Sequence, residues 1–281
     1  MAFAMCGSSV ALARTGYYQF PDLHDRAIVF AAEGDLWTVP DTGGTARRLT
    51  THAGAEYFPR YSPDGKAIAF TGEYDGNRDV YVIPADGGEP RRLTWHPEAD
   101  EVIDWTPDGK RIIFRSHAGN DTTSGSEWHL FAVPVDGGDP EPLPLGWAGR
   151  VAIDPVSRRW AFNRSSVEFR TWKRYRGGTA PSIWVGDPDK HDFKEIAKPP
   201  GADAFPMWSG GRIFFLSDQG GTGNLWSMKP DGSERKRETH ETGWDVRWPA
   251  VSPAGRSGCA LGGALLIYTP GAQPGTGKDH K

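Results

Sequence analysis

Three histidines stand at matching places in this sequence and are the first candidates for metal chemistry. His52, His96 and His240 each follow, by one or two residues, the threonine that ends a repeated phrase. Three imidazoles are a common ligand set for zinc. If the repeat closes into a ring, however, the three positions are spread around its circumference. We therefore interpret them as a remnant of the repeat and predict neither a metal nor any other cofactor.

Four acidic residues form a second candidate group, because each begins an inner strand of the repeat: Glu56, Asp100, Asp203 and Asp245. Such positions lie beside the central channel of a ring. Four carboxylates there would form an acidic collar that attracts basic side chains or N-terminal amines. The simpler alternative is that each carboxylate only solvates the end of its strand.

Motifs for covalent catalysis are missing from the sequence. It contains no Gly-x-Ser-x-Gly elbow, no His-Glu-x-x-His and no Cys-x-x-Cys. The stretch 275–278 lacks the first glycine of a phosphate-binding loop and is followed by Asp279. An acyl-enzyme route needs a nucleophile, a base and an oxyanion site within mutual reach. We predict no catalytic residue here and no peptide hydrolysis by this chain alone.

Two alternating phrases indicate the elements that position these residues. The first reads DLWTVPDTGGTARRLT at residues 35–50 and recurs at 79–94, 129–144 and 224–239, with a decayed copy at 182–197. The second carries a Pro-Asp-Gly turn, as in YSPDGKAIAF at residues 61–70. Proline and glycine suit the special backbone angles of such turns. Four short strands per unit of about 40–45 residues are typical of a β-propeller blade.

The inner-strand phrases number six, which predicts an all-β, TolB-like six-bladed propeller over residues 16–270. Blades two to five are complete in sequence. The sixth keeps a turn at 251–255 and a third-strand pattern at 264–268, but its second strand is reduced to 257–261 and no fourth strand follows. We expect residues 1–15 to be a tail in which 8–14 is a candidate closing strand, and 271–281 to be a disordered tail.

Composition narrows the partners and the compartment. The chain has 281 residues, 37% of them hydrophobic, which is enough for a sizeable core, and its net charge of −4 gives no reason to expect nucleic-acid binding. No run approaches the roughly 20 apolar residues of a membrane-spanning helix. Cys6 and Cys259 lack motif spacing, so disulfides are not the scaffold. We expect a cytoplasmic protein without nucleic-acid or membrane partners.

An insertion in the fourth blade is the strongest candidate for a binding surface. It brings together aromatic, cationic and glycine residues: Trp172, Lys173, Tyr175, Arg176, Gly177, Gly178, Thr179 and Trp184. Aromatic residues with arginine are enriched at interface hot spots, and glycine permits a sharp bend. We predict an inter-domain contact here; the alternative is that the aromatics cover the side of blade four. The polar insertion at 116–127 is interpreted as a surface loop.

The phrase from Trp172 to Thr179, followed by Ile183 and Trp184, resembles a signature of the N-terminal propellers of tricorn proteases. The opening DLHDRAIVF at 22–30 and the PDG and RRLT repeats are similar as well. The resemblance covers about residues 16–270. It implies a large cytosolic serine peptidase that trims oligopeptides, with a second propeller, a PDZ-like domain and catalytic domains after this one. It also implies these domains and oligopeptides as partners, and a homo-oligomer, hexameric in the family.

The resemblance carries over no catalytic residue, because the family's serine, histidine and oxyanion-hole residues lie in the later domains. Some members also hold a peptide carboxylate with paired arginines before the third blade's inner strand, where this chain reads WHPEADE at 95–101. The repeats alone also occur in TolB-type and dipeptidyl-peptidase-type propellers. Three interpretations stay open: a tricorn-type propeller truncated before its catalytic domains, a free-standing TolB-like interaction propeller, and the gating propeller of a prolyl-oligopeptidase-type hydrolase.

Overall fold

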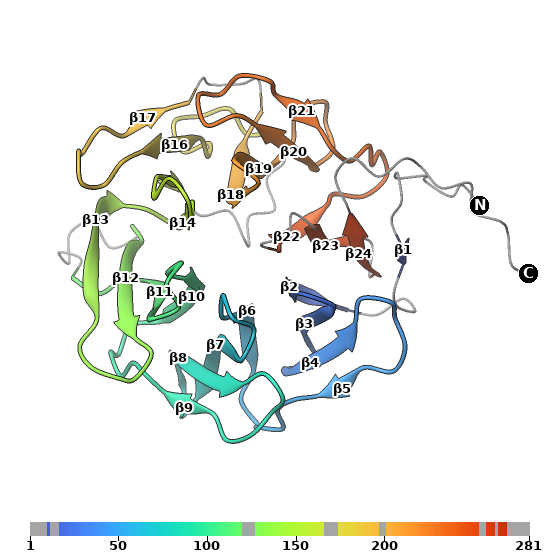
Figure 1. Ribbon diagram of the computed structural model, residues 1–281, viewed down its shortest axis with the longest axis vertical. Coiled ribbons are helices and arrows are strands. Elements are labelled where there is room, and N and C mark those ends of the chain that lie inside the picture. The colour runs from blue at the N-terminus through green and yellow to red at the C-terminus, as the bar shows by residue number, and fades with distance from the viewer. Residues whose placement is uncertain are drawn as a thin grey trace, which may run out of the picture.

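The computed structural model describes residues 10–11, 17–119, 127–165, 174–196, 201–252, 257–261 and 264–268. Its strands form six four-stranded antiparallel sheets that stand like blades around a common centre (Figure 1). The predicted all-β six-bladed propeller is thereby confirmed. Within the described ranges, no helix has the length and apolar character needed to cross a membrane.

Each blade runs from an inner strand at the centre to an outer strand at the rim (Figure 1). Blade one comprises β2 (Gln19–His24), β3 (Ala27–Ala32), β4 (Asp35–Pro40) and β5 (Arg47–Arg48). Blade two comprises β6 (Glu56–Tyr61), β7 (Ala67–Tyr74), β8 (Asn77–Pro84) and β9 (Arg91–Arg92). Blade three comprises β10 (Asp100–Trp105), β11 (Arg111–Ser116), β12 (His129–Pro134) and β13 (Glu141–Trp147). Blades four and five comprise β14 (Arg150–Ile153), β15 (Trp160–Asn163), β16 (Ile183–Gly186) and β17 (Lys194–Glu195); and β18 (Asp203–Ser209), β19 (Arg212–Ser217), β20 (Asn224–Met228) and β21 (Lys236–Arg237).

The sixth blade draws its strands from both ends of the chain. The C-terminal part supplies β22 (Arg247–Val251), β23 (Ser257–Leu261) and β24 (Ala264–Tyr268), and the N-terminal part supplies β1 (Val10–Ala11). β1 pairs antiparallel with β24, with Val10 opposite Ile267 and Ala11 opposite Leu266. These two residues belong to the expected closing segment 8–14, whose other residues lie outside the described ranges, as does the tail 271–281.

In blades one and two, the repeated phrase encodes a clamp that holds the outer strand. In blade two, Arg92 forms an ion pair with the buried Asp79 at 2.7 Å and donates from Nε to the Thr94 carbonyl at 2.8 Å. The Thr94 hydroxyl accepts from the Val80 N–H at 3.0 Å. Arg48 repeats this pattern in blade one through contacts to Asp35 and Thr50. With this clamp, an outer strand of only two residues can remain paired with its neighbour, because side-chain hydrogen bonds replace missing backbone hydrogen bonds between the strands.

Four of the six inner strands share a bulge at an aromatic–proline pair. Phe20, Phe58, Phe205 and Trp248 each precede a proline and have positive φ angles between 46° and 57°. The pairing register shifts at these places in β2, β6, β18 and β22. The Phe20 ring lies 4.3 Å from that of Phe58 and 4.8 Å from that of Trp248. Aromatic packing therefore joins blades six, one and two at the inner circle.

Candidate functional site

The fourth-blade insertion is described from Arg174 onward, and this part is attached to blade five. The Arg174 N–H donates to Asp218 at 2.9 Å, and the Arg176 guanidinium forms an ion pair with the same carboxylate at 3.1 Å. The side chain of Arg176 is still 41% exposed. Trp172 and Lys173 lie outside the described residues. The sequence placed these cations together, but gave no indication that Asp218 would hold them.

Gly177 and Gly178 lie in a turn of this insertion. A Cβ at Gly177 would lie 2.0 Å from the hydroxyl oxygen of Tyr175, so any side chain there would displace the tyrosine. Gly178 has open space around it. Gly177, Gly178 and Thr179 are exposed, and Tyr175 is half-buried. The bend thus presents backbone and small side chains to solvent beside Arg176.

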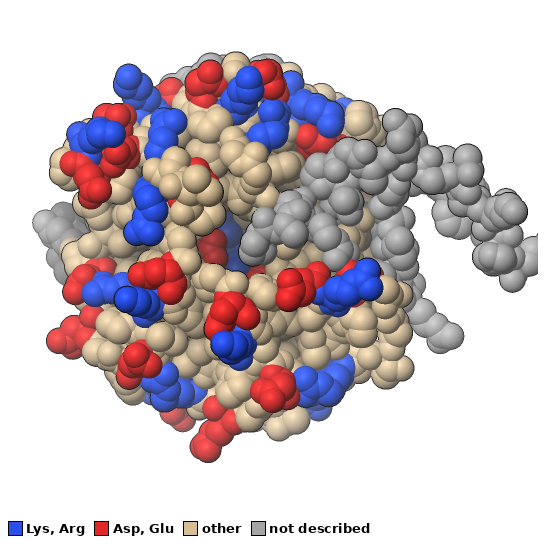
Figure 2. All heavy atoms as spheres, viewed as in Figure 1, with Lys and Arg blue, Asp and Glu red and all other residues tan. Residues whose placement is uncertain are grey.

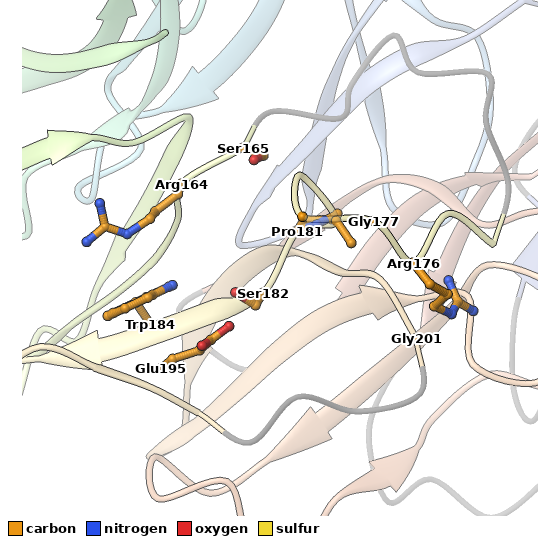
Figure 3. Close-up of a pocket in the computed structure, with 11 residues that line it drawn as sticks. Arg164, Ser165, Arg176, Gly177, Pro181, Ser182, Trp184, Glu195 and Gly201 are labelled. Atoms are coloured by element: carbon orange, nitrogen blue, oxygen red, sulfur yellow. The ribbon is translucent and has the colours of Figure 1, made fainter.

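A cavity of about 390 Å³ lies under this bend (Figure 3). Figure 3 shows Arg164 and Trp184 on one side of it, and Arg176 and Gly201 on the other. The Arg164 guanidinium stands 4.5 Å from the centre of the Trp184 ring, a cation–π distance. Trp184 also packs on Phe162 at 6.3 Å, so the indole serves the blade as well as the cavity wall. Glu195 lines the cavity as well, and Arg176 is paired with Asp218, so two cations, one carboxylate and an indole surround it.

Two of the four predicted collar carboxylates are engaged within the protein. Glu56 is buried and accepts from the Leu36 N–H at 3.0 Å and from the hydroxyls of Thr50 and Tyr74. Burial raises the pKa of Glu56 despite these contacts. Asp203 is buried and forms two 2.7 Å hydrogen bonds with the Arg235 guanidinium. Both side chains join neighbouring elements, which is a structural role.

The other two collar residues differ from these and from each other. Asp245 lies two residues before β22, is half-buried, and accepts from the Gly223 N–H at 2.9 Å. Asp100 begins β10, is 1% exposed, and has an Oδ1 without a hydrogen-bond partner among the described residues. Burial raises the pKa of Asp100 to about 6, although the Ser116 and Thr94 hydroxyls lower it in part. The repeat makes these positions look equivalent, but their surroundings do not.

The three histidines are exposed and act locally. Nδ1 of His52 accepts from the Gly54 N–H at 2.9 Å, and Nδ1 of His96 accepts from the Glu98 N–H at 3.1 Å. His240 is exposed beside the buried Thr239. Among the residues that the structure describes, no group of three or more His, Cys, Asp or Glu side chains is arranged to hold a metal. Cys259 is buried as a free thiol, and Cys6 is outside the described ranges.

A row of alternating charges on the inner strands was missed from the sequence. Asp22, Arg60 and Asp104 follow the bulge in blades one to three, and Arg150 begins β14 of blade four. Burial raises the pKa of Asp104 to about 6, and Arg60 opposes that shift. Figure 2 shows acidic and basic atoms together in the hollow at the centre of the face it displays. The signal was present, because each of the first two charges follows an aromatic–proline pair.

Comparison with known proteins agrees with this architecture. Residues 15–258 match a protein family described as the tricorn protease N-terminal beta propeller domain. The chain is 38% identical over 242 residues to "Tricorn protease homolog 1" of Streptomyces coelicolor, an alignment that covers 85% of this chain and 22% of that relative. The curated relatives matched over most of this chain are thus spanned for only about a quarter of their length.

Solved structures give the same result. The crystal structure of the tricorn protease superposes with a TM-score of 0.82 at 26% identity, covering 95% of this chain and 27% of that one. A putative TolB from Agrobacterium tumefaciens has a TM-score of 0.69 at 20% identity, covering 91% of each chain. At that identity the second likeness concerns the fold alone.

Proposed function

Because the chain belongs to the family of tricorn protease N-terminal β-propellers, we propose that it is a non-catalytic propeller module of a tricorn-like serine peptidase. The module docks on the catalytic part and guides oligopeptides toward it, and the whole protein degrades oligopeptides. The family match over residues 15–258 carries this proposal. Reading the DNA beyond Lys281 in all frames tests it most cheaply, since a second propeller and a peptidase domain should follow.

Guidance of oligopeptides is supported by the charges at the inner strands. A free oligopeptide carries an ammonium group at one end and a carboxylate at the other. The alternation of Asp22, Arg60, Asp104 and Arg150 offers both signs of charge around one circle. An acidic collar alone would attract only one end of such a substrate.

We propose further that the protein works in the cytoplasm and assembles as a homo-oligomer. Light scattering of the full-length protein would measure its oligomeric state.

The chain alone is expected to hydrolyse no peptide. Catalysis by an acyl-enzyme route needs a nucleophile, a base and an oxyanion site in reach of one another, and the sequence holds no motif for such a set. The pure chain would be incubated with fluorogenic tri- and tetrapeptides. Turnover that a serine-directed inhibitor abolishes would contradict this expectation, whereas turnover that resists the inhibitor would point to a contaminant.

Docking through the fourth-blade cavity is expected to depend on its two arginines. The double variant Arg164→Ala/Arg176→Ala should bind the remaining domains of a tricorn-type peptidase at least tenfold more weakly, because a hot-spot truncation costs about 2 kcal/mol. Exposed ion pairs contribute at most about 1 kcal/mol, so the melting temperature of the propeller should hardly change. Binding would be measured by titration against the Streptomyces relative lacking its own propeller.

A matched control for this experiment is Arg26→Ala. The Arg26 side chain is 83% exposed and lies 4.0 Å from Asp41, in blade one and away from the cavity. It should bind like the unchanged chain. The docking proposal fails if the Arg164→Ala/Arg176→Ala variant binds the remaining domains as well as the control does. If its propeller also melts several degrees lower, the insertion is part of blade packing.

A further inference from the structure

A second cavity, of about 600 Å³, lies between blades two and three. The segment from Leu93 to Pro97 forms one wall, and Phe114 of β11 with Phe131 of β12 forms another. The turn at 138–140 lies at its rim. This volume falls within the range of sites that take a small molecule or a peptide side chain.

The walls of this cavity are mostly apolar and aromatic. The rings of Phe114 and Phe131 stack at 5.6 Å, and Phe114 is buried. Trp95 is 64% exposed at the mouth, and the Arg92 guanidinium stands 5.9 Å from its ring centre. The indole thus offers an apolar surface at the mouth that a ligand could cover. The faces of such rings attract cations through their quadrupoles.

Asp100 is the most buried polar residue of this cavity, which Thr94, His96 and Asp139 also line. It lines the cavity, is 1% exposed, and its Oδ1 has no hydrogen-bond partner within the described residues. The equivalent residues of blades two and five are satisfied: Glu56 by two hydroxyls and an N–H, and Asp203 by Arg235. A buried carboxylate oxygen without a partner is costly unless a donor arrives from outside. Asp100 is therefore the one of these three with an unpartnered carboxylate oxygen, and it lines the cavity.

The nearby cations of the protein do not supply this donor. Arg92 is paired with Asp79, and the exposed His96 accepts a hydrogen bond from its own turn. Asp79 is a second negative charge close by, and it raises the pKa of Asp100 further. The exposed Asp139 adds a third negative charge at the rim. The negative charges around the cavity therefore favour a positively charged ligand.

We propose that this cavity binds a primary ammonium group on an apolar stem, with Asp100 as its ion-pair partner and Trp95, Phe114 and Phe131 as its aromatic walls. In a peptide this group is either a lysine side chain or the free N-terminus. The ammonium brings three donors to the unpartnered oxygen, and its methylene or side-chain stem lies against the rings. The inference goes beyond the proposed function and needs no peptidase domain.

The test uses the propeller chain and three matched lysinamide probes, with affinity measured by saturation-transfer NMR. Nα-acetyl-lysinamide carries only the side-chain ammonium, Nε-acetyl-lysinamide carries only the α-ammonium, and the doubly acetylated form is neutral. At least one charged probe should bind, and the neutral form should bind at least tenfold more weakly. The stronger of the two charged probes identifies the source of the ammonium. Equal binding of all three, or no binding of either charged probe at millimolar concentration, would overturn the proposal.

Variants locate the binding. Asp100→Asn should lower the affinity of the preferred probe at least tenfold. Asp136→Asn should leave it unchanged, because Asp136 is exposed and does not line the cavity. Trp95→Ala should weaken binding severalfold, whereas Trp147→Ala, a 51% exposed indole of β13, should not. Trp95 is exposed, so its variant tests the cavity even if Asp100→Asn fails to fold. Full affinity in both Asp100→Asn and Trp95→Ala would refute the site.

The pH dependence of binding gives an independent check. Below pH 6 the affinity should fall by on the order of tenfold per unit, because Asp100 becomes protonated and no longer attracts an ammonium. His96 also lines the cavity, so the profile would be repeated in His96→Gln. The fall should persist in His96→Gln and vanish in Asp100→Asn. If the fall in affinity disappears in His96→Gln, the pH dependence belongs to the imidazole, and the role of Asp100 is contradicted. A negative result in these binding experiments would not bear on the proposals that the propeller docks on catalytic domains and belongs to a peptidase.

Discussion

Replacing Arg115 by alanine is expected to lower the free energy of unfolding by about 3–5 kcal/mol, because breaking a buried ion pair leaves its partner uncompensated. Arg115 is 1% exposed in β11, and its Nε donates to Glu101 at 2.8 Å. Its guanidinium stands 4.5 Å from the Trp128 ring and 5.8 Å from the Phe58 ring of blade two. Removing it deletes a charge partner and a packed side chain together. Urea denaturation followed by tryptophan fluorescence would measure the loss.

Arg111→Ala is the matched control for this experiment. Arg111 lies in the same strand and pairs with Glu141, but the two side chains are 35% and 66% exposed. Exposed pairs contribute about 0–1 kcal/mol, so the control should unfold almost as the unchanged protein does. Arg78 also pairs with Glu101, at 2.9 Å, and would remain in the Arg115 variant. Equal, small losses in both variants would mean that Arg78 alone satisfies Glu101.

The architecture could be predicted from the sequence because its determinants are local. The Pro-Asp-Gly turns require a left-handed glycine, and Gly65 and Gly109 have φ angles of 71° and 68°. The arginine and threonine of the repeated phrase hold strands of the same blade, as Arg92 and Thr94 do. Such contacts span few residues, so a single copy of the phrase contains both partners. Six copies of the inner-strand phrase then determine the number of blades.

The environment of each site residue could not be predicted, because decisive partners stand outside the repeated phrases, elsewhere in the same blade or in the next one. Glu56 and Asp100 occupy the same place in successive repeats, yet Tyr74 reaches Glu56 and, among the described residues, no equivalent donor reaches Oδ1 of Asp100. Asp218, which holds the fourth-blade insertion, stands in blade five and carries no motif. Arg115 likewise belongs to neither of the two repeated phrases. Long-range pairing decides which of several similar carboxylates is free to bind a ligand.

Phe20→Ala is expected to cost about 3–5 kcal/mol of stability, the range for deleting a buried aromatic ring. In a six-fold ring, the spacing between equivalent neighbours equals their distance from the axis. The spacings of 4.3 Å and 4.8 Å therefore place the rings of Phe58, Phe20 and Trp248 close to the axis. Phe20 is 1% exposed and packs on both of the other rings. Its strand β2 lies beside β22 at the seam where blades six and one meet (Figure 1). Its loss would leave a cavity where the ring closes.

Alanine is the right substitution because it isolates packing from backbone strain. Phe20 has a φ of 51°, a left-handed conformation that costs alanine about as much as phenylalanine, whereas glycine would relieve it. The control is Tyr17→Ala, since Tyr17 is an aromatic residue three positions away that is 76% exposed. It should change stability by less than about 0.5 kcal/mol. If Phe20→Ala is as mild as Tyr17→Ala, the aromatic cluster does not hold the seam, and the pairing of β1 with β24 must carry closure of the ring instead.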